Sequence, residues 1–224
     1  MGVGRDPLSG ATWLPLAAYL IGSLPVSLWV GRRWGRHDLR TAGSGNLGAT
    51  NVLRVAGRGP ALLAFSGDAA KGAVAVLLGR ELAAPEGYLA LAVLSAVLGH
   101  MFSPWVRFRG GKGVATAFGG FLLLAPAVTG CALLVFVALV VRYRYVSLGS
   151  ICGVLSFPLI WLLLARFGDH PPPGEITLAA AVAIGFLVLW RHAGNIRRLR
   201  GGSEARIGRS IGGSAAESST EARS

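Results

Sequence analysis

Seven apolar runs dominate this 224-residue chain and constrain its fold more than any other feature. A transmembrane helix needs about 20 mostly apolar residues. Hydrophobic residues make up 53% of the chain, and only 14% are charged, against about 25% in soluble domains. The sequence therefore predicts an all-α protein, a polytopic integral membrane helical bundle. The predicted spans are 12–31, 60–79, 87–105, 114–125, 127–141, 148–166 and 175–191.

The distribution of positive charge indicates how many of these runs cross the membrane. Residues 114–125 would rise only about 18 Å as a helix, so the alternative is one span over 114–141, kinked at Pro126. Seven spans with an external N-terminus leave 18 Lys and Arg residues inside and three outside, whereas six spans put the basic tail outside. Because cytoplasmic loops carry the excess of Lys and Arg, we predict seven transmembrane helices, with the N-terminus outside and the C-terminus cytoplasmic.

Residues 1–208 are expected to form a single membrane domain. Residues 209–224 have almost no apolar content, which predicts a disordered cytoplasmic tail. The net charge of +12 lies between the apolar runs, as the positive-inside pattern requires, so we expect no nucleic-acid partner. Cys131 and Cys152 fall inside apolar segments, and no acidic cluster suggests a metal. We therefore expect neither a metal nor a cofactor.

The first inside loop contains Gly43, Gly45 and Gly48 in a G-x-G-x-x-G pattern. A dinucleotide fingerprint requires a strand before the pattern and a helix after it, and here the flanks are membrane helices, so that reading is rejected. Closely spaced glycines can instead turn backbone N–H groups toward an anion. The side chains that would add donors for phosphate are Ser44, Asn46, Thr50, Asn51 and Arg54. The alternative is a flexible linker.

A second glycine-rich stretch, Gly110-Gly111-Lys112-Gly113, precedes the fourth apolar run, which includes Thr116. Glycines at a helix start supply bare N–H groups, and Lys112 adds an ammonium. The stretch is not a Walker A loop, because position 106 is not glycine. Just before it, His100 could serve as a base or as a hydrogen-bonded interfacial histidine. We therefore predict a second anion site on the inside face.

Ionisable groups inside a span are costly and usually face the bundle interior or a wet cavity. Asp68 and Lys71 stand three residues apart in the second run, so they share a helix face. We expect Asp68 to position Lys71 near the phosphate cavity, with a purely structural pair as the alternative.

The last two inside segments add further polar groups. Ser147 and Ser150 lie at the start of the sixth run. Beyond the seventh run, His192, Asn195 and Leu199 would share one face of a continuing helix. A polybasic tail binding anionic lipid explains the neighbouring arginines, but it does not explain His192, Asn195 or the lone Glu204.

These segments, in this order, resemble the PlsY family of acyl-phosphate–glycerol-3-phosphate acyltransferases. The matching pieces are Gly43 to Asn46 through Thr50, Asn51 and Arg54; Asp68 to Gly72; Gly99-His100 through Gly110 to Thr116; and His192, Asn195-Ile196, Arg198-Leu199, Gly202 and Glu204. The resemblance runs from about residue 12 to residue 208. It implies a seven-span enzyme of bacterial phospholipid biosynthesis in the cell inner membrane, with its active site on the cytoplasmic face.

The resemblance also implies the reaction: a fatty acyl group passes from acyl-phosphate to the sn-1 hydroxyl of glycerol 3-phosphate, giving lysophosphatidic acid and phosphate. By position, Ser44, Arg54, Lys112, His192 and Asn195 match catalytic or phosphate-site residues of the family. Ser147 matches less closely, and Ser150 is an equally good candidate. We expect direct transfer in a monomer, with His192 or a substrate phosphate oxygen as the proton acceptor.

Two functions from other classes are alternatives. A membrane transporter of a phosphorylated small metabolite would explain the anion sites and the Asp68–Lys71 pair, but it predicts polar groups along a path to both faces. A non-catalytic scaffold with a polybasic tail would leave Ser44, His192 and Asn195 without a role. Because the polar groups crowd one face, the enzyme is favoured.

Overall fold

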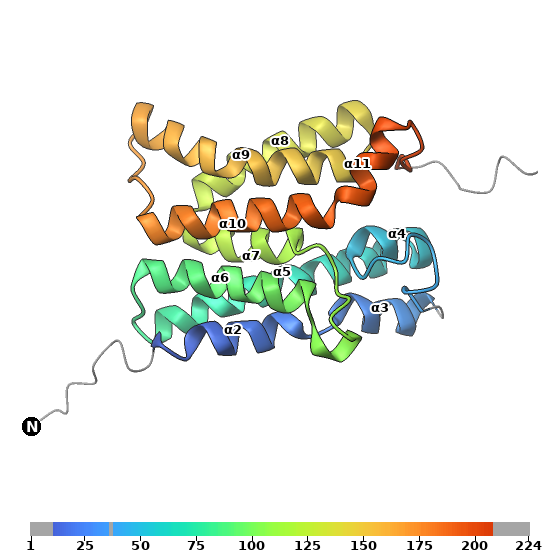
Figure 1. Cartoon of the computed structure of the whole chain (residues 1–224), viewed down its shortest axis with the longest axis horizontal. Coiled ribbons are helices and arrows are strands. Elements are labelled where there is room, and N and C mark those ends of the chain that lie inside the picture. The colour runs from blue at the N-terminus through green and yellow to red at the C-terminus, as the bar shows by residue number, and fades with distance from the viewer. Residues whose placement is uncertain (1–10, 36–37, 208–224) are drawn as a thin grey trace, which may run out of the picture.

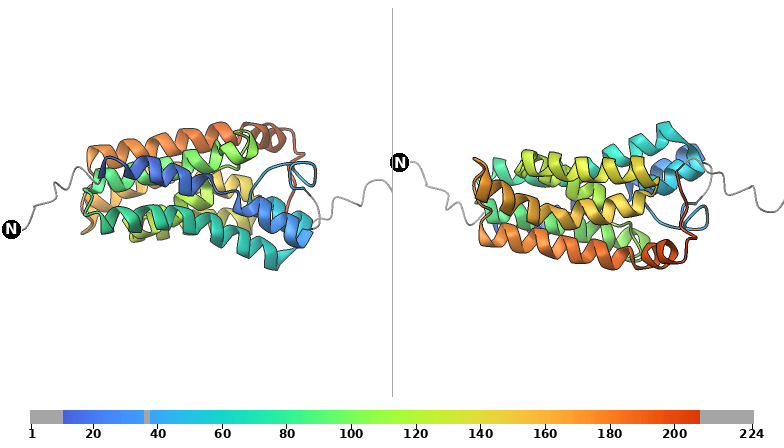
Figure 2. Two further views of the ribbon diagram at one scale, coloured as in Figure 1. Left: turned by 90° about the horizontal axis from the view of Figure 1, so that it is seen from below. Right: turned by 90° about the horizontal axis from the view of Figure 1, so that it is seen from above.

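The computed structural model describes residues 11–35 and 38–207 of the chain. These residues form ten α-helices, a short 3-10 helix at Pro104–Val106 and no strand, as expected of an all-α protein. The helices are α2 (Leu14–Ser23), α3 (Val26–Gly35), α4 (Ala49–Ala56), α5 (Arg58–Glu81), α6 (Glu86–Met101), α7 (Val114–Leu124), α8 (Pro126–Tyr143), α9 (Val146–Phe167), α10 (Glu175–Arg191) and α11 (Ala193–Arg200). They lie along a common axis, with α3, α4 and α11 at one end (Figures 1 and 2).

Several helices have the length and composition of membrane spans. Five stretches qualify: Leu14–Gly35, Arg58–Glu81, Glu86–Val106, Pro126–Tyr143 and Val146–Phe167. The pair α10 and α11, bent by 57°, would make a sixth, and α7 is a shorter apolar helix of 11 residues. Large apolar side chains such as Leu134, Phe167 and Phe186 are 66–79% exposed on outer faces. A bilayer, not water, suits such a surface.

The fourth and fifth predicted runs form two helices, so the alternative of one kinked span over 114–141 does not describe the structure. Helix α7 ends at Leu124, Ala125 is not helical, and Pro126 begins α8, where its missing N–H is not needed. Val114 at the start of α7 and Val146 at the start of α9 line the same cavity. Helix α7 therefore starts at this cavity. Helix α8 ends near it, because α9 begins soon after α8 ends, so α7 and α8 run in opposite directions.

The first predicted span, 12–31, is interrupted rather than continuous. The break falls at Leu24 and Pro25, because proline cannot donate to the preceding turn and disfavours helical backbone in the residue before it. At the break the Leu24 carbonyl accepts from the N–H of Val26 at 2.9 Å, and Lys71 Nζ from α5 also donates to it, at 3.0 Å. A neighbouring helix thus satisfies the interrupted backbone, as membrane helices require.

Glycines bring α5 and α7 into close contact. A Cβ atom on Gly119 would lie 1.9 Å from the carbonyl oxygen of Ala69, and one on Gly72 would lie 2.0 Å from that of Thr116. Small residues at such contacts allow membrane helices to pack backbone against backbone. At the same contact, Thr116 Oγ1 donates to the carbonyl of Asp68 at 2.9 Å. This packing fixes the start of α7, where the candidate site begins.

Candidate active site

A polar cavity of about 400 Å³ lies at the end of the bundle where α3, α4 and α11 gather (Figure 1). Its walls come from the loop before α4, from α4 to α9, and from the α10–α11 junction. The lining residues are Ser44, Asn46, Gly48, Ala49, Thr50, Asn51, Arg54, Phe65, Asp68, His100, Lys112, Gly113, Val114, Ala115, Phe136, Val146, Ser147, Ser150, His192, Asn195 and Arg198.

The loop before α4 holds Ser44 between two glycines whose backbone conformation other residues rarely adopt. Gly43 and Gly45 have φ values of +62° and +71°, in the left-handed region. Asn51, which is buried on α4, ties this loop down: its Oδ1 accepts from the Ser44 N–H at 2.7 Å, and its Nδ2 donates to the carbonyls of Leu39 and Ala42. Asn51 therefore shapes the loop and is not the free phosphate donor that the sequence predicted.

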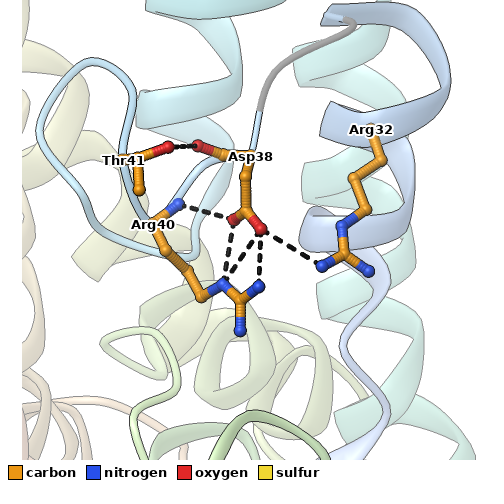
Figure 3. Close-up of polar contacts among 4 residues, drawn as sticks. All are labelled: Arg32, Asp38, Arg40 and Thr41. Carbon is orange, nitrogen blue, oxygen red and sulfur yellow. Dashed lines mark hydrogen bonds and ion pairs between the residues drawn. The ribbon is translucent and has the colours of Figure 1, made fainter.

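Asp38 anchors the start of the same loop between two arginines (Figure 3). Its carboxylate lies 2.6 Å from Arg40 Nη2 and 3.1 Å from Arg32 Nη2, and Thr41 Oγ1 donates to its carbonyl. The side chain and backbone N–H of Arg40 hold the pKa of the Asp38 carboxyl below its ordinary value. Sequence reasoning missed this anchor, although an acid in an arginine-rich segment was a visible signal. Neither arginine lines the cavity.

The sequence predicted that the Gly110–Gly113 loop supplies bare backbone N–H groups, and in the structure two of the four are already bonded. The N–H groups of Gly110 and Gly111 donate to the carbonyls of Met101 and His100, at 3.0 and 3.2 Å. On its other side, Arg191 donates to the carbonyls of the two glycines. Among the described residues no partner accepts from the N–H groups of Lys112 and Gly113. These two donors, with the first turn of α7, are free for an anion.

A chain of hydrogen bonds holds Lys112 at the cavity. Its Nζ donates to Asn195 Oδ1, and Asn195 Nδ2 donates to Glu204 Oε1 at 2.6 Å. The same carboxylate accepts from Ser147 Oγ at 2.8 Å and from Arg198 Nε at 2.7 Å. Glu204, which had no explained role in the sequence, thus connects α9, α11 and the glycine loop.

The charges along this chain depend on burial. Burial lowers the pKa of the Lys112 ammonium to about 8; Glu204 opposes that shift, while Arg198 and Arg54 add to it. For Glu204, burial alone would raise the pKa, but hydrogen bonds from Asn195, Arg198 and Ser147 outweigh it and hold the pKa below its ordinary value. Near neutral pH the chain therefore joins a cation to an anion, and such charge-assisted hydrogen bonds are the stronger kind.

Asp68 and Lys71 form a buried ion pair on α5. Lys71 Nζ lies 2.8 Å from Asp68 Oδ1, and the two residues are only 4% and 2% exposed. Ser27 donates to the other carboxylate oxygen at 2.5 Å, and Lys71 Nζ lies 2.9 Å from His100 Nδ1. Asp68 and His100 line the cavity, whereas Lys71 stands behind them. A buried pair without such partners would be costly, so these contacts account for its place in a span.

His192 lies at the junction of α10 and α11, which meet at 57°. The expected continuing helix is therefore wrong, yet the bend still brings His192 and Asn195 to the cavity. His192 Nδ1 lies 2.8 Å from the carbonyl oxygen of Val188. A carbonyl only accepts, so Nδ1 carries the hydrogen and the neutral ring keeps its lone pair on Nε2.

A second cavity, of about 120 Å³ and almost wholly apolar, lies deeper between the helices. Four residues line both cavities: Phe65, Val114, Phe136 and Ser150. Phe121 and Phe157 both line it, with ring centroids 4.5 Å apart. The two cavities therefore adjoin, one lined by charged groups and the other apolar, an arrangement that suits an amphiphile.

The structure gathers most of the predicted site residues. Those lining the polar cavity are Ser44, Asn46, Thr50, Asn51, Arg54, Asp68, Lys112, Gly113, Ser147, Ser150, His192 and Asn195. Those outside its lining are Gly43, Gly45, Lys71, Gly110, Gly111 and Thr116, which shape or support its walls. Sequence reasoning missed Arg198, Phe65 and Phe136 as lining residues. Arg198 stood in a basic tail and the two phenylalanines in apolar runs, so neither had a distinguishing local signal.

Comparisons with known proteins agree with this arrangement. Residues 12–202 match the family model described as glycerol-3-phosphate acyltransferase. A glycerol-3-phosphate acyltransferase of Thermus thermophilus is 42% identical over 204 residues, covering 91% of this chain and 98% of the relative. One from Geotalea daltonii is 42% identical over 191 residues, covering 85% and 94%.

Two crystal structures of PlsY, an integral membrane glycerol 3-phosphate acyltransferase, are also similar. The glycerol 3-phosphate form has a TM-score of 0.79 at 38% identity, covering 88% of this chain and 96% of that one. The lysophosphatidic acid form has a TM-score of 0.77 at 36% identity, covering 88% and 95%. The match extends over sequence, fold and nearly the whole length, and the chain belongs to the glycerol-3-phosphate acyltransferase family.

Proposed function

We propose that this protein transfers a fatty acyl group from an acyl phosphate to the sn-1 hydroxyl of glycerol 3-phosphate, giving lysophosphatidic acid and inorganic phosphate. The observation that carries the proposal is a pair of adjoining cavities: a polar one lined by cations, sharing Phe65, Val114, Phe136 and Ser150 with an apolar one. An acyl phosphate has the same two parts. The relatives and the PlsY structures, named for acyl transfer to glycerol 3-phosphate, support the acceptor.

The charges in the polar cavity suit two phosphate groups. Arg54, Lys112 and Arg198 supply three cations, and the one lining carboxylate, Asp68, is paired with Lys71. Preorganised donors aimed at developing negative charge are usually the largest catalytic contribution. An acyl phosphate is already activated, so stabilising the departing phosphate and holding the hydroxyl near the carbonyl carbon supply most of what the reaction needs.

The reaction proceeds by direct transfer. The glycerol hydroxyl oxygen attacks the acyl carbonyl carbon, the carbon–oxygen bond to phosphate breaks, and the phosphate leaves with the bonding electrons. The hydroxyl proton passes to His192 Nε2, which has its lone pair free because Nδ1–H donates to Val188, or to a substrate phosphate oxygen. Lys112, Arg54 and Arg198 hold the phosphates, and Ser44 and Asn195 orient them.

A covalent intermediate on Ser44 is the competing mechanism. A serine nucleophile needs an adjacent base, and among the described residues none donates to or accepts from the Ser44 hydroxyl. Direct transfer therefore predicts no acyl-enzyme. Mass spectrometry of enzyme quenched during turnover checks this, and an acylated Ser44 peptide would replace the direct scheme with a two-step one.

Topology completes the proposal. Seven crossings, with α7 as the short one and α10–α11 as the last, put the polar cavity on the cytoplasmic side, because the Lys and Arg excess lies at that end. The N-terminus is then outside, and a monomer suffices since the cavity is complete within one chain. Cysteine accessibility on the two faces of sealed vesicles tests the orientation: a cysteine at Arg144 reacts only from the cytoplasmic side, and one at Asp169 only from outside.

The reaction itself is tested with purified protein in detergent, palmitoyl phosphate and glycerol 3-phosphate, following phosphate and lysophosphatidic acid together. Arg54→Ala removes a cavity cation, and Arg58→Ala, an exposed arginine outside the cavity, is its matched control. We expect equal release of both products, a loss of about a hundredfold or more in kcat/KM for Arg54→Ala, and at most a twofold change for Arg58→Ala.

A parallel reaction with palmitoyl-CoA tests the donor, and it should yield no product. If folded, lipid-supplemented wild-type protein makes no lysophosphatidic acid from palmitoyl phosphate, the enzyme proposal fails. Uptake of radiolabelled glycerol 3-phosphate into proteoliposomes would then test the transporter alternative.

A further inference from the structure

His100 is a buried histidine in the cavity wall that the reaction scheme above does not use. It is 8% exposed, lies in the last turn of α6, and lines the polar cavity together with Asp68. Its ring has two distinct nitrogens, and their partners decide what the ring can do. The contacts of Nδ1 decide which of the two nitrogens carries the hydrogen in the neutral ring.

Lys71 determines the state of Nδ1. Its Nζ lies 2.9 Å from His100 Nδ1, 3.0 Å from the Leu24 carbonyl oxygen and 2.8 Å from Asp68 Oδ1. An ammonium has three hydrogens and no lone pair, so it can donate a hydrogen bond but cannot accept one. The Leu24 carbonyl and the Asp68 carboxylate can only accept, so Lys71 is the donor toward them and toward Nδ1 as well. Nδ1 is therefore an acceptor, and the ring hydrogen is on Nε2.

The arrangement excludes a base oriented by a carboxylate. In such a pair the carboxylate accepts a hydrogen bond from Nδ1, but Asp68 Oδ1 is 3.6 Å from His100 Nδ1, which is too long. His100 thus has the opposite tautomer to His192, whose Nδ1 donates to a carbonyl. One cavity histidine can take up a proton, and the other can only donate a hydrogen bond.

The Nε2–H group faces the glycine loop. A Cβ atom on Gly111 would lie 2.1 Å from Nε2, so the missing side chain leaves room for this edge of the ring. Among the described residues, nothing accepts a hydrogen bond from Nε2. This edge of the ring therefore faces the glycine loop, and His100 lines both the polar cavity and a small cavity of about 10 Å³ that Gly111 also lines.

We propose that His100 is a neutral hydrogen-bond donor that binds a phosphate oxygen through Nε2–H, and that Lys71 is the positioning residue that sets its tautomer. The inference rests on the proposed function, since it assigns one more ligand to the phosphate groups of that site. A neutral donor adds a directed hydrogen bond without adding a fourth positive charge to a cavity that already holds three. A phosphate monoester and an acyl phosphate offer the same oxygens, so either substrate could be the one bound.

Nitrogen-15 NMR of histidine-labelled protein tests the tautomer directly, with the His100 signals assigned by substitution. We expect an unprotonated Nδ1 and a protonated Nε2 in the free enzyme, and a shift of the Nε2 signal when glycerol 3-phosphate, inorganic phosphate or a non-hydrolysable acyl phosphonate is added. A protonated Nδ1 would overturn the inference. So would an Nε2 signal that none of the three ligands moves, which is expected if Nε2–H binds only a water in the small cavity of about 10 Å³ beside Leu47.

Two variants separate the roles of the two nitrogens. His100→Asn keeps an acceptor near the Nδ1 position for Lys71 but removes the donor to the cavity; His100→Gln places an amide donor near Nε2. A hydrogen bond to a charged group is worth roughly tenfold to a hundredfold in affinity. We expect His100→Asn to raise KM by at least tenfold for one phosphate substrate, and His100→Gln to recover most of that loss, at similar Tm values.

Measuring KM separately for glycerol 3-phosphate and palmitoyl phosphate tells which phosphate is bound. Equal KM values in the two variants, with both still folded, would overturn the inference while leaving the proposed function intact. Absence of acyl transfer by the wild-type enzyme would instead refute the proposed function, and the tautomer measurement would still stand.

Discussion

Glu204 provides the sharpest test of how the site is held together. Its Oε1 accepts from Ser147 and Asn195, and its Oε2 accepts from Arg198. In Glu204→Gln the amide oxygen can keep both bonds on the first side, so only the bond from Arg198 is lost, with an N–H facing an N–H. Arg198 is half exposed, and solvent screens such a pair, so we expect a loss of only about 1 kcal/mol.

Glu204→Ala has a larger effect because it removes all three bonds. The amide of Asn195 and the hydroxyl of Ser147 are buried and lose their acceptor, at about 1–3 kcal/mol for each group. We expect a loss of stability of about 3 kcal/mol, which lowers Tm by about 6–12 °C in a chain of this size. Because Asn195 also accepts from Lys112, kcat/KM should fall further than the folded fraction does.

The assay compares thermal unfolding in detergent with kcat/KM at a temperature where every variant is folded. Glu81→Ala, which removes an exposed carboxylate at the end of α5, is the control and should change Tm by no more than about 1–2 °C. If Glu204→Ala leaves Tm and kcat/KM unchanged, the carboxylate does not hold Asn195 and Lys112. If Tm and kcat/KM fall as far in Glu204→Gln as in Glu204→Ala, the negative charge of Glu204 decides the effect, and the number of hydrogen bonds lost does not.

Three further predictions follow from burial and packing. Lys112 must be charged to bind phosphate, and burial lowers its pKa to about 8 in the free enzyme, so kcat/KM should fall as pH rises through about 8. Lys112→Arg should remove that decline in a pH–rate profile, and a profile that the substitution leaves unchanged contradicts the phosphate-binding role of Lys112. Gly119→Ala puts a methyl group 1.9 Å from the Ala69 carbonyl oxygen, whereas in the control Gly130→Ala the new Cβ meets nothing within 4 Å. In thermal unfolding only Gly119→Ala should lower Tm, by about 5 °C or more, and equal Tm values for the two variants would refute the close contact. Ala132→Phe fills the apolar cavity, so it should lower kcat/KM for palmitoyl phosphate much more than for octanoyl phosphate, and an equal effect on both would exclude this cavity as the acyl site.

Much of the fold could be predicted from the sequence because each membrane helix is recognisable from the composition of its own residues. Long apolar runs and basic loops between them suffice to predict an all-helical membrane bundle, and the boundaries of α5, α6 and α9 fall close to the predicted runs. The interruption at Leu24 and Pro25 was missed, because an apolar run tolerates a break that a neighbouring helix can satisfy. That neighbour, Lys71, lies far away in the sequence.

The membership of the site was also largely local information. Glycine-rich loops with cations and amides mark anion sites by composition, so Ser44, Arg54, Lys112, His192 and Asn195 could be named in advance, and all five line the cavity. The work each atom does was not predictable, since a side chain's free donors depend on partners from distant segments. Asn51 was expected to contact phosphate, but its amide is used up by its own loop.

By itself the sequence determined the class of protein, the end of the bundle where the chemistry gathers, and which residue types are there, because apolar periodicity, charge bias and glycine spacing act within a few residues. The tertiary structure alone decided the hydrogen-bond partners. The glycine N–H groups donate to Met101 and His100, Glu204 accepts from Asn195, and the two cavity histidines have different neighbours at Nδ1, Lys71 for His100 and the Val188 carbonyl for His192. The physical reason is that a buried polar atom must be satisfied by whatever the fold brings within about 3 Å of it. Which atom that is depends on the packing of helices far apart in the chain.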